Sequence, residues 1–208
     1  MKKGLFITFE GPEGSGKSTH IQLLAKYLRG QKKQVLVTRE PGGTPFSAGI
    51  RKLLLDGRED LSPMAELFLY EADRAQHLQE TLVPALRQKR IVLCDRYTDS
   101  TIAYQGSGRG LDMATIETLN NIAADELTPH LTILLDVPVE RGLKLAKKKK
   151  NHHDRLERAG IAFHRRVRQG FLRLAKKNPG RFRVVSQQKS IEATQNLIRD
   201  AVAPLISQ

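Results

Sequence analysis

The chain has 208 residues, enough for one domain with a sizeable core, and its hydrophobic content of 39% is that of a globular protein. The single cysteine, Cys94, excludes a disulfide framework and indicates a reducing compartment. No apolar run is long enough to span a membrane or to form the core of a signal peptide, so we expect a cytoplasmic protein without membrane contact.

The formal net charge of +13 is concentrated in one region. Between residues 141 and 183, 16 lysines and arginines stand against two acids. A solvated helical face, a flap that handles anions and a nucleic-acid surface all fit such a segment. The few aromatic residues there fall mostly on a helical apolar stripe, so nucleic acid is the weakest of the three interpretations.

A β-rich apolar run over residues 4–9 opens the chain and leads into G-P-E-G-S-G-K-S, residues 11–18. This segment matches G-x-x-x-x-G-K-[ST], a loop whose backbone N–H groups point at phosphate oxygens. The apolar spacing over 18–29 predicts the helix that must follow such a loop. We therefore expect the phosphates of ATP at Gly11, Pro12, Glu13, Gly14, Ser15, Gly16, Lys17, Ser18 and Thr19.

Two residues of this loop have predictable chemistry. Lys17 would reach the β- and γ-phosphates of ATP, and the hydroxyl of Ser18 would ligate Mg²⁺. The second magnesium residue is Asp95, which ends an apolar strand predicted over 91–95. In enzymes with this loop, an aspartate at that point acts on the metal directly or through water.

The residues between these segments alternate strands and helices. A strand over 34–38 is followed by the loop Arg39–Thr44, whose charged residues fit a ligand site or a solvated turn equally well. We expect further helices over 46–56, from Pro63 with Ser62 as N-cap, over 112–126, over 139–148, from Arg155 to Asn178 and after Ser190. The helix that starts at Pro63 should be interrupted at Pro84. Further strands are expected over 131–136 and 181–185.

Five strands that alternate with helices predict an α/β fold, with a mostly parallel sheet covered by helices on both faces. Residues 1–208 should form this single domain. The run Lys147–Lys150 and the polar stretch after it have no apolar anchor, so we expect a small mobile lid over about 144–158. Neighbouring His152 and His153 would not face one metal ion from a helix.

The phosphate-binding loop leaves several enzyme classes open. Neither the N-K-x-D motif nor the D-x-x-G switch of GTPases occurs in a plausible place, and motor ATPases need more chain. A small kinase needs a second pocket for an acceptor, and arginines near the predicted strand ends could line it. A basic nucleic-acid-binding protein that carries this loop is the alternative from another class.

Several motifs together resemble those of bacterial thymidylate kinases, a family of nucleoside monophosphate kinases. These are T-R-E-P-G-G-T at 38–44, D-R-A-Q-H at 73–77, D-R-Y-T-D-S at 95–100, Y-Q-G at 104–106 and D-R-L-E at 154–157. The resemblance covers essentially the whole chain. It implies a homodimer that transfers the γ-phosphoryl of ATP to dTMP with Mg²⁺, giving dTDP and ADP for dTTP synthesis.

The resemblance also assigns roles to residues. Arg39 and Arg96 would hold the 5′-phosphate of dTMP, and Glu13 would accept a hydrogen bond from the 3′-hydroxyl. Arg74 would donate to thymine, while Tyr104 would exclude a ribose 2′-hydroxyl. The remaining substrate residues would be Tyr70 as the stacking residue, Ser100, Thr101 and Gln105, and the catalytic residues Lys17, Asp95, Arg96 and Arg155.

The sequence departs from the family pattern at two places. Tyr70 stands where phenylalanine is usual, and Lys147–Lys150 stand where bacterial members carry lid arginines, so that only Arg155 matches by type. Lysine supplies charge without the planar fork of arginine, which leaves open whether the lysines or Arg155 stabilise the transferring phosphoryl. Kinases for other nucleoside monophosphates also remain an alternative.

Overall fold

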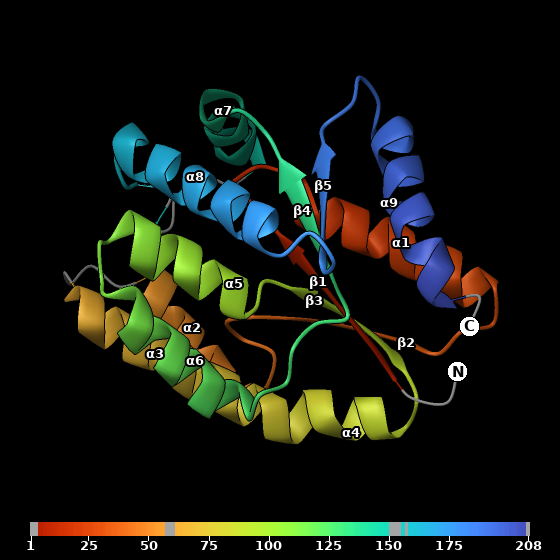
Figure 1. Ribbon diagram of the computed structural model, residues 1–208, viewed down its shortest axis with the longest axis horizontal. Coiled ribbons are helices and arrows are strands. Elements are labelled where there is room, and N and C mark those ends of the chain that lie inside the picture. Colours follow the sequence, from red (N-terminus) through yellow and green to blue (C-terminus); the bar gives the residue numbers. More distant parts are fainter. Residues whose placement is uncertain (1–3, 57–60, 150–154, 157, 207–208) are drawn as a thin grey trace.

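The computed structural model describes residues 4–56, 61–149, 155–156 and 158–206 (Figure 1). Within these residues one five-stranded sheet runs in the order β2-β3-β1-β4-β5, and every pairing is parallel. This confirms the predicted α/β sheet. The strands are β1 (Leu5–Glu10), β2 (Val35–Arg39), β3 (Ile91–Asp95), β4 (Leu131–Asp136) and β5 (Phe182–Ser186).

Helices cover both faces of the sheet (Figure 1). On one face lie α1 (Lys17–Gly30) and α9 (Ile191–Ile206), which contact each other. The opposite face is covered by α3 (Pro63–His77), α4 (Val83–Arg87), α6 (Met113–Ala124) and α8 (Ile161–Lys177). The short helix α5 (Thr98–Thr101) lies between α6 and α8 and contacts both (Figure 1). The remaining helices are α2 (Pro45–Asp56) and α7 (Val139–Lys149).

The central strand β1 shows why helices must cover both faces of the sheet. Its side chains alternate, so Ile7 and Phe9 pack against α1 and α9 while Phe6 packs with Tyr97 on the other face. All six residues of β1 are buried. A strand buried on both faces is expected to be mainly apolar in sequence, and β1 is apolar apart from Thr8 and the terminal Glu10.

Two helix boundaries were predicted wrongly. Pro84 does not interrupt the helical segment, because α3 continues through a π-helical segment, Leu78–Leu82, into α4. Proline lies in the first turn of α4, where its missing N–H costs little. Helix α8 begins at Ile161 rather than at the predicted Arg155. Arg155 lies in a turn, and its backbone N–H donates to the carbonyl oxygen of Leu55.

Other local predictions are confirmed. The hydroxyl of Ser62 accepts a hydrogen bond from the N–H of Ala65, and Ser190 caps α9 in the same way through Ala193. The lid prediction falls partly outside the described residues, because 150–154 and 157 are not among them, and it stays a prediction. Across the described ranges, no helix combines the length and the apolarity that crossing a bilayer requires.

The phosphate-binding loop and α7 approach each other closely at Gly142. A Cβ added there would meet the carbonyl oxygen of Glu13 at 2.3 Å, whereas one added at Gly49 in α2 would meet no atom within 4 Å. Gly49→Ala should therefore raise the free energy of unfolding by about 0.5–1 kcal/mol through helix propensity. Gly142→Ala should lower it by about 1–3 kcal/mol, because the loop and the helix must separate.

Urea unfolding of the two variants checks this pair. The two substitutions have the same intrinsic effect on a helix, so the difference between them isolates the contact of the loop with α7. Equal stabilisation of both variants would show that α7 has room to move away from the loop.

Candidate active site

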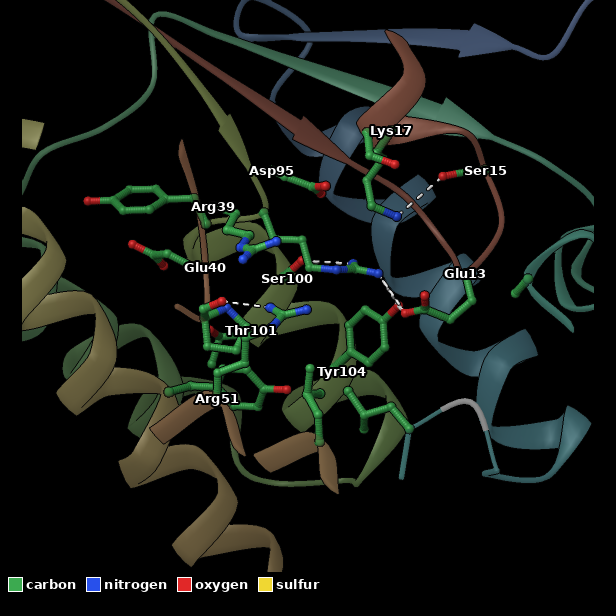
Figure 2. Close-up of a pocket in the computed structure, with 18 of the residues that line it drawn as sticks. Glu13, Ser15, Lys17, Arg39, Glu40, Arg51, Asp95, Ser100, Thr101 and Tyr104 are labelled. Atoms are coloured by element: carbon green, nitrogen blue, oxygen red, sulfur yellow. Dashed lines mark hydrogen bonds and ion pairs between the residues drawn. The ribbon is translucent and has the colours of Figure 1, made fainter. Parts of the chain in front are cut away.

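The carboxyl ends of β1, β2 and β3 open onto a cleft of about 330 Å³ (Figure 2), the place where parallel α/β sheets bind ligands. The predicted site residues that line it are Glu13, Gly14, Ser15, Gly16, Lys17, Ser18, Arg39, Tyr70, Arg74, Asp95, Arg96, Ser100, Thr101, Tyr104 and Gln105. Gly11, Pro12, Thr19 and Arg155 do not line it.

The loop between β1 and α1 is curled around the side chain of Lys17. Gly14 and Gly16 have φ angles of 69° and 90°, in the left-handed region that glycine adopts at little cost. The ammonium of Lys17 donates to the carbonyl oxygens of Gly11 at 3.0 Å and Pro12 at 3.1 Å. Burial and the neighbouring Arg96 lower the pKa of Lys17 to about 8. An anion in the loop would offer this cation better partners than neutral carbonyls.

Two oxygen donors suit a magnesium ion. Ser18 is exposed and Asp95 is half-buried, and both residues line the cleft. Neither side chain makes a hydrogen bond to another described residue. Mg²⁺ usually takes one or two protein oxygens and completes its shell with water and phosphate, so these residues fit it. Within the described residues, no group of three histidines, cysteines or acids could hold a metal alone.

An ion pair joins the phosphate-binding loop to the segment after β3 (Figure 2). Arg96 donates from Nη2 to Oε1 of Glu13 at 2.6 Å, and the hydroxyl of Tyr104 donates to the same oxygen at 2.7 Å. Burial opposes ionisation of Glu13, but Arg96 and Lys17 outweigh it and lower the pKa of Glu13 to about 2. Arg96 also donates to Ser100, from a backbone with φ of 72°.

A second group of cations faces the cleft from the side of β2. Arg39 is exposed at the end of that strand and makes no hydrogen bond through its side chain to another described residue. Arg51 of α2 lines the same cleft and donates to the carbonyl of Pro41 at 2.7 Å. The sequence analysis did not select Arg51, although its helix directly follows the charged loop after β2. With Arg96, these side chains form a site for an anion.

Arg74 is buried at the base of the cleft, where it is 1% exposed. It donates from Nε to Glu40 at 3.0 Å, from Nη1 to Glu71 at 2.6 Å and to Asn120 at 2.7 Å, and from Nη2 to Thr101 at 2.9 Å. These bonds use four of its five N–H groups, which leaves one on Nη2. Arg74 therefore holds the fold together and can still donate once to a ligand.

Gln105 lies at the same end of the cleft and is held from behind by Glu66 of α3. Its Nε2 donates to Glu66 at 2.6 Å, so the carbonyl Oε1 is the free end of the amide. Arg155, expected at the transferring phosphoryl, instead donates to Glu66 and to the carbonyl of Leu54. The sequence analysis missed Glu66, because a glutamate in the first turn of a helix is ordinarily a solvated residue.

Most arginines of the basic segment that the structure describes have partners on the protein. Arg165 pairs with Glu140, Arg168 pairs with Asp136 at 2.7 Å, and Arg166 donates to the carbonyl of Gly108. These contacts fix α8 against its neighbours, which favours the interpretation as a structural and solvated face over a nucleic-acid surface.

A phosphate-binding loop facing a cationic pocket across one cleft defines a P-loop phosphotransferase for a small anionic acceptor. The family model described as thymidylate kinase matches residues 9–198. Thymidylate kinase of Geotalea uraniireducens is 49% identical over 99% of both chains, and that of Trichlorobacter lovleyi is 51% identical over 95% of this chain and 96% of its own. The chain belongs to the thymidylate kinase family.

A solved structure agrees with this assignment. The crystal structure of thymidylate kinase from Ehrlichia chaffeensis superposes with a TM-score of 0.79 at 37% identity. The match covers 96% of this chain and 98% of that one, so the similarity extends over nearly the whole of both chains.

A buried carboxyl behind the cleft should make stability depend on pH. Glu10 accepts from the N–H of Tyr97 at 2.8 Å and from the hydroxyl of Ser100 at 2.5 Å, and burial with nearby Asp99 raises the pKa of Glu10 from 4.5 to about 8. Between these values the unfolded chain has lost the proton that the folded chain keeps. The free energy of unfolding should therefore fall as pH rises through this window, by at most about 1.4 kcal/mol per pH unit.

Glu10→Gln removes the titrating group and should flatten this dependence. The measurement is urea unfolding of both proteins at several pH values across the window, with the difference in the free energy of unfolding as the readout. Other titrating groups cancel in that difference. Parallel pH profiles would show that Glu10 has the same pKa in the folded and unfolded chains.

Proposed function

We propose that this protein transfers the γ-phosphoryl group of ATP to the 5′-phosphate of dTMP and so supplies dTDP for dTTP synthesis. The observation that carries the proposal is that Lys17, Arg39 and Arg96 line one and the same cleft. Family membership supports the same reaction, because the relatives at about half identity are thymidylate kinases. The free, buried thiol of Cys94 supports a cytoplasmic location.

The donor half of the cleft would hold the phosphates of ATP. Backbone N–H groups of the loop and the N-terminus of α1 would bind the phosphate oxygens, and Lys17 would leave its carbonyl partners for the β- and γ-phosphates. Ser18 and Asp95 would hold Mg²⁺, which when bound supplies positive charge to the phosphate oxygens.

The acceptor half would hold the phosphate of dTMP. Arg39, Arg51 and Arg96 would bind its oxygens with planar forks and aim one of them at the γ-phosphorus. That oxygen forms the new bond to phosphorus, while the bond from the γ-phosphorus to its bridging oxygen breaks and leaves ADP. The protein thus contributes mainly position and positive charge, which is what phosphoryl transfer requires.

The deep end of the acceptor half suits thymine. The free N–H of Arg74 would donate to the O4 carbonyl, and Oε1 of Gln105 would accept from the neighbouring N3–H. Cytosine reverses both groups, with an amino group at position 4 and an unprotonated N3, so it would leave both protein groups unpaired. Tyr70 would stack on the base, and Thr101 would lie beside it.

The sugar would lie between the two halves. Glu13 and Tyr104 are hydrogen-bonded to each other at the mouth of the acceptor pocket. The Glu13 carboxylate is an acceptor for a 3′-hydroxyl, while the Tyr104 ring would occupy the space that a ribose 2′-hydroxyl needs. This arrangement supports a preference for deoxynucleotides.

The direct test of the proposed function is ADP release with a panel of monophosphates. Purified protein with ATP and Mg²⁺ should turn over dTMP fastest, dUMP more slowly, and dCMP and AMP at the background rate. Preferred turnover of dCMP or AMP would establish a kinase for another nucleoside monophosphate. No turnover with any acceptor would overturn the proposal.

Lys17→Met should reduce kcat by about a hundredfold or more, because a positioned charge is lost at the transition state. Methionine keeps much of the apolar stem, which matters because Lys17 is 8% exposed. The control is Lys26→Met on the exposed side of α1, which should leave kcat unchanged. Wild-type turnover by a folded Lys17→Met protein would place the phosphates elsewhere.

We also propose that the protein is a homodimer joined through α2, α3 and α6. Helix α3 contacts both α2 and α6 (Figure 1). The three helices carry Phe46, Leu53, Phe68 and Ile122, each more than half exposed to solvent. Scattered apolar residues are normal on a surface, but several on adjoining helices mark an interface. The same helices support the acceptor pocket on their inner side.

Phe68→Glu should convert the dimer to a monomer, because it places a charge in an apolar interface. Size-exclusion chromatography with light scattering gives the mass directly. The control is Val184→Glu on the edge strand β5, where Val184 is 48% exposed and the neighbouring elements are β4, α8 and α9. A monomeric wild-type protein, or a dimeric Phe68→Glu variant, would contradict the proposed interface.

A further inference from the structure

The carboxylate of Glu66 is the centre of a cluster beside the acceptor pocket. Its side chain is completely buried, yet no motif or reaction step uses it. Oε1 accepts from Gln105 at 2.6 Å and from Nε of Arg109 at 3.3 Å, and Oε2 accepts from Arg109 at 3.0 Å and from Arg155. The two arginines outweigh the effect of burial and, with Gln105, lower the pKa of Glu66.

We propose that Glu66 is a positioning residue that sets base selectivity from outside the cleft, and that Arg155 acts through it. Glu66 fixes the amide of Gln105 with its nitrogen toward α3 and its oxygen toward the substrate. Arg109 and Arg155 in turn fix Glu66. The proposal rests on the proposed function, since it concerns how that reaction selects its acceptor.

The orientation of the Gln105 amide follows from charge. An ionised carboxylate only accepts hydrogen bonds, so it binds the NH₂ end of an amide and repels the carbonyl end. A rotated amide would bring two oxygens together in a site that is shielded from water, which is costly. Glu66 therefore makes Oε1 of Gln105 the group that faces the base, and this acceptor is complementary to the N3–H of thymine.

Arg155 is held in the same cluster by three bonds. Its Nη2 donates to Glu66, its Nε donates to the carbonyl of Leu54 at 3.2 Å, and its backbone N–H donates to Leu55 at 3.1 Å. Leu55 and Leu156, the residues next to these contacts, line the cleft. The side chain of Arg155 is only 12% exposed, so moving its guanidinium to a phosphate would break the pair with buried Glu66. Arg155 thus holds the acceptor wall in place.

Arg109 gives the cluster a second anchor. It follows the π-helical segment Ile102–Gly108, which carries Gln105, and its guanidinium lies 4.8 Å from the centre of the Phe163 ring. Two positive charges beside one carboxylate keep Glu66 ionised. The amide of Gln105 therefore meets a permanent negative charge throughout the neutral range.

The first experiment measures base selectivity in Glu66→Gln. Glutamine can donate as well as accept, so Gln105 is released to rotate and present either end to the base. The ratio of kcat/KM for dTMP to that for dCMP should fall by about tenfold. The change should lie in KM for dTMP, with kcat within about threefold of wild type.

The matched control is Glu140→Gln. Glu140 also pairs with an arginine, Arg165, but on the exposed surface, where the two side chains are 54% and 63% exposed. The same chemical substitution there should leave the selectivity ratio unchanged. An unchanged ratio in Glu66→Gln as well would overturn the proposal.

The second experiment tests whether Arg155 acts through Glu66. Arg155→Met should lower the selectivity ratio in the same direction, and the double variant with Glu66→Gln should be no worse than Glu66→Gln alone. A loss of kcat of a hundredfold or more in Arg155→Met, with KM for dTMP and the ratio unchanged, would show direct contact with the transferring phosphoryl and overturn this role.

Variants of Arg155 keep the proposal testable if Glu66→Gln fails to fold. Arg155→Met leaves Glu66 paired with Arg109, and Arg155→Lys keeps a positive charge beside it, so Lys should restore part of the selectivity that Met loses. An unchanged ratio in both would overturn the proposal. Turnover of dTMP by the wild-type protein tests the proposed function separately.

Discussion

The ion pair between Arg96 and Glu13 is the contact on which the organisation of the cleft depends. It connects the phosphate-binding loop after β1 to the segment after β3, and thus the donor half to the acceptor half. Both side chains are 17% exposed. The pair is therefore shielded enough to hold the loop and the segment after β3 together, and a ligand can still reach it. An anion between the halves would compete with Glu13 for Arg96, so acceptor binding and loop geometry are coupled.

The buried charged side chains around the acceptor pocket are already paired with opposite charges of the protein. Arg74 lies between Glu40 and Glu71, and Glu66 lies between Arg109 and Arg155. A buried ion pair contributes little net stability, but removal of one partner costs about 3–5 kcal/mol because the other charge remains buried. Such pairs hold donors and acceptors in fixed orientations, which is what discrimination between similar bases requires.

The sheet and the phosphate-binding loop could be predicted from the sequence because each depends on local pattern. The run at 4–9, the glycines of the loop and the helical spacing after Lys17 agree with one another, and the structure confirms them. The boundaries at Pro84 and Arg155 were wrong for different reasons. Pro84 lies in the first turn of α4, where a missing N–H is tolerated, so a local rule was misapplied. Arg155 is held outside a helix by contacts with Leu54, Leu55 and Glu66, which are far away in sequence.

The site residues show the same division between local and distant information. Motifs identify the residues that face the cleft, since a charged side chain after a buried strand is conspicuous in the sequence. They do not identify the residues behind it, because Glu66 looks like an ordinary glutamate in a first helical turn and Arg51 like a solvated helical residue. What makes Glu66 different is burial with two arginines from distant segments, so its role follows from the tertiary structure. If Glu66 has the role proposed above, base selectivity depends partly on residues that lie behind the cleft.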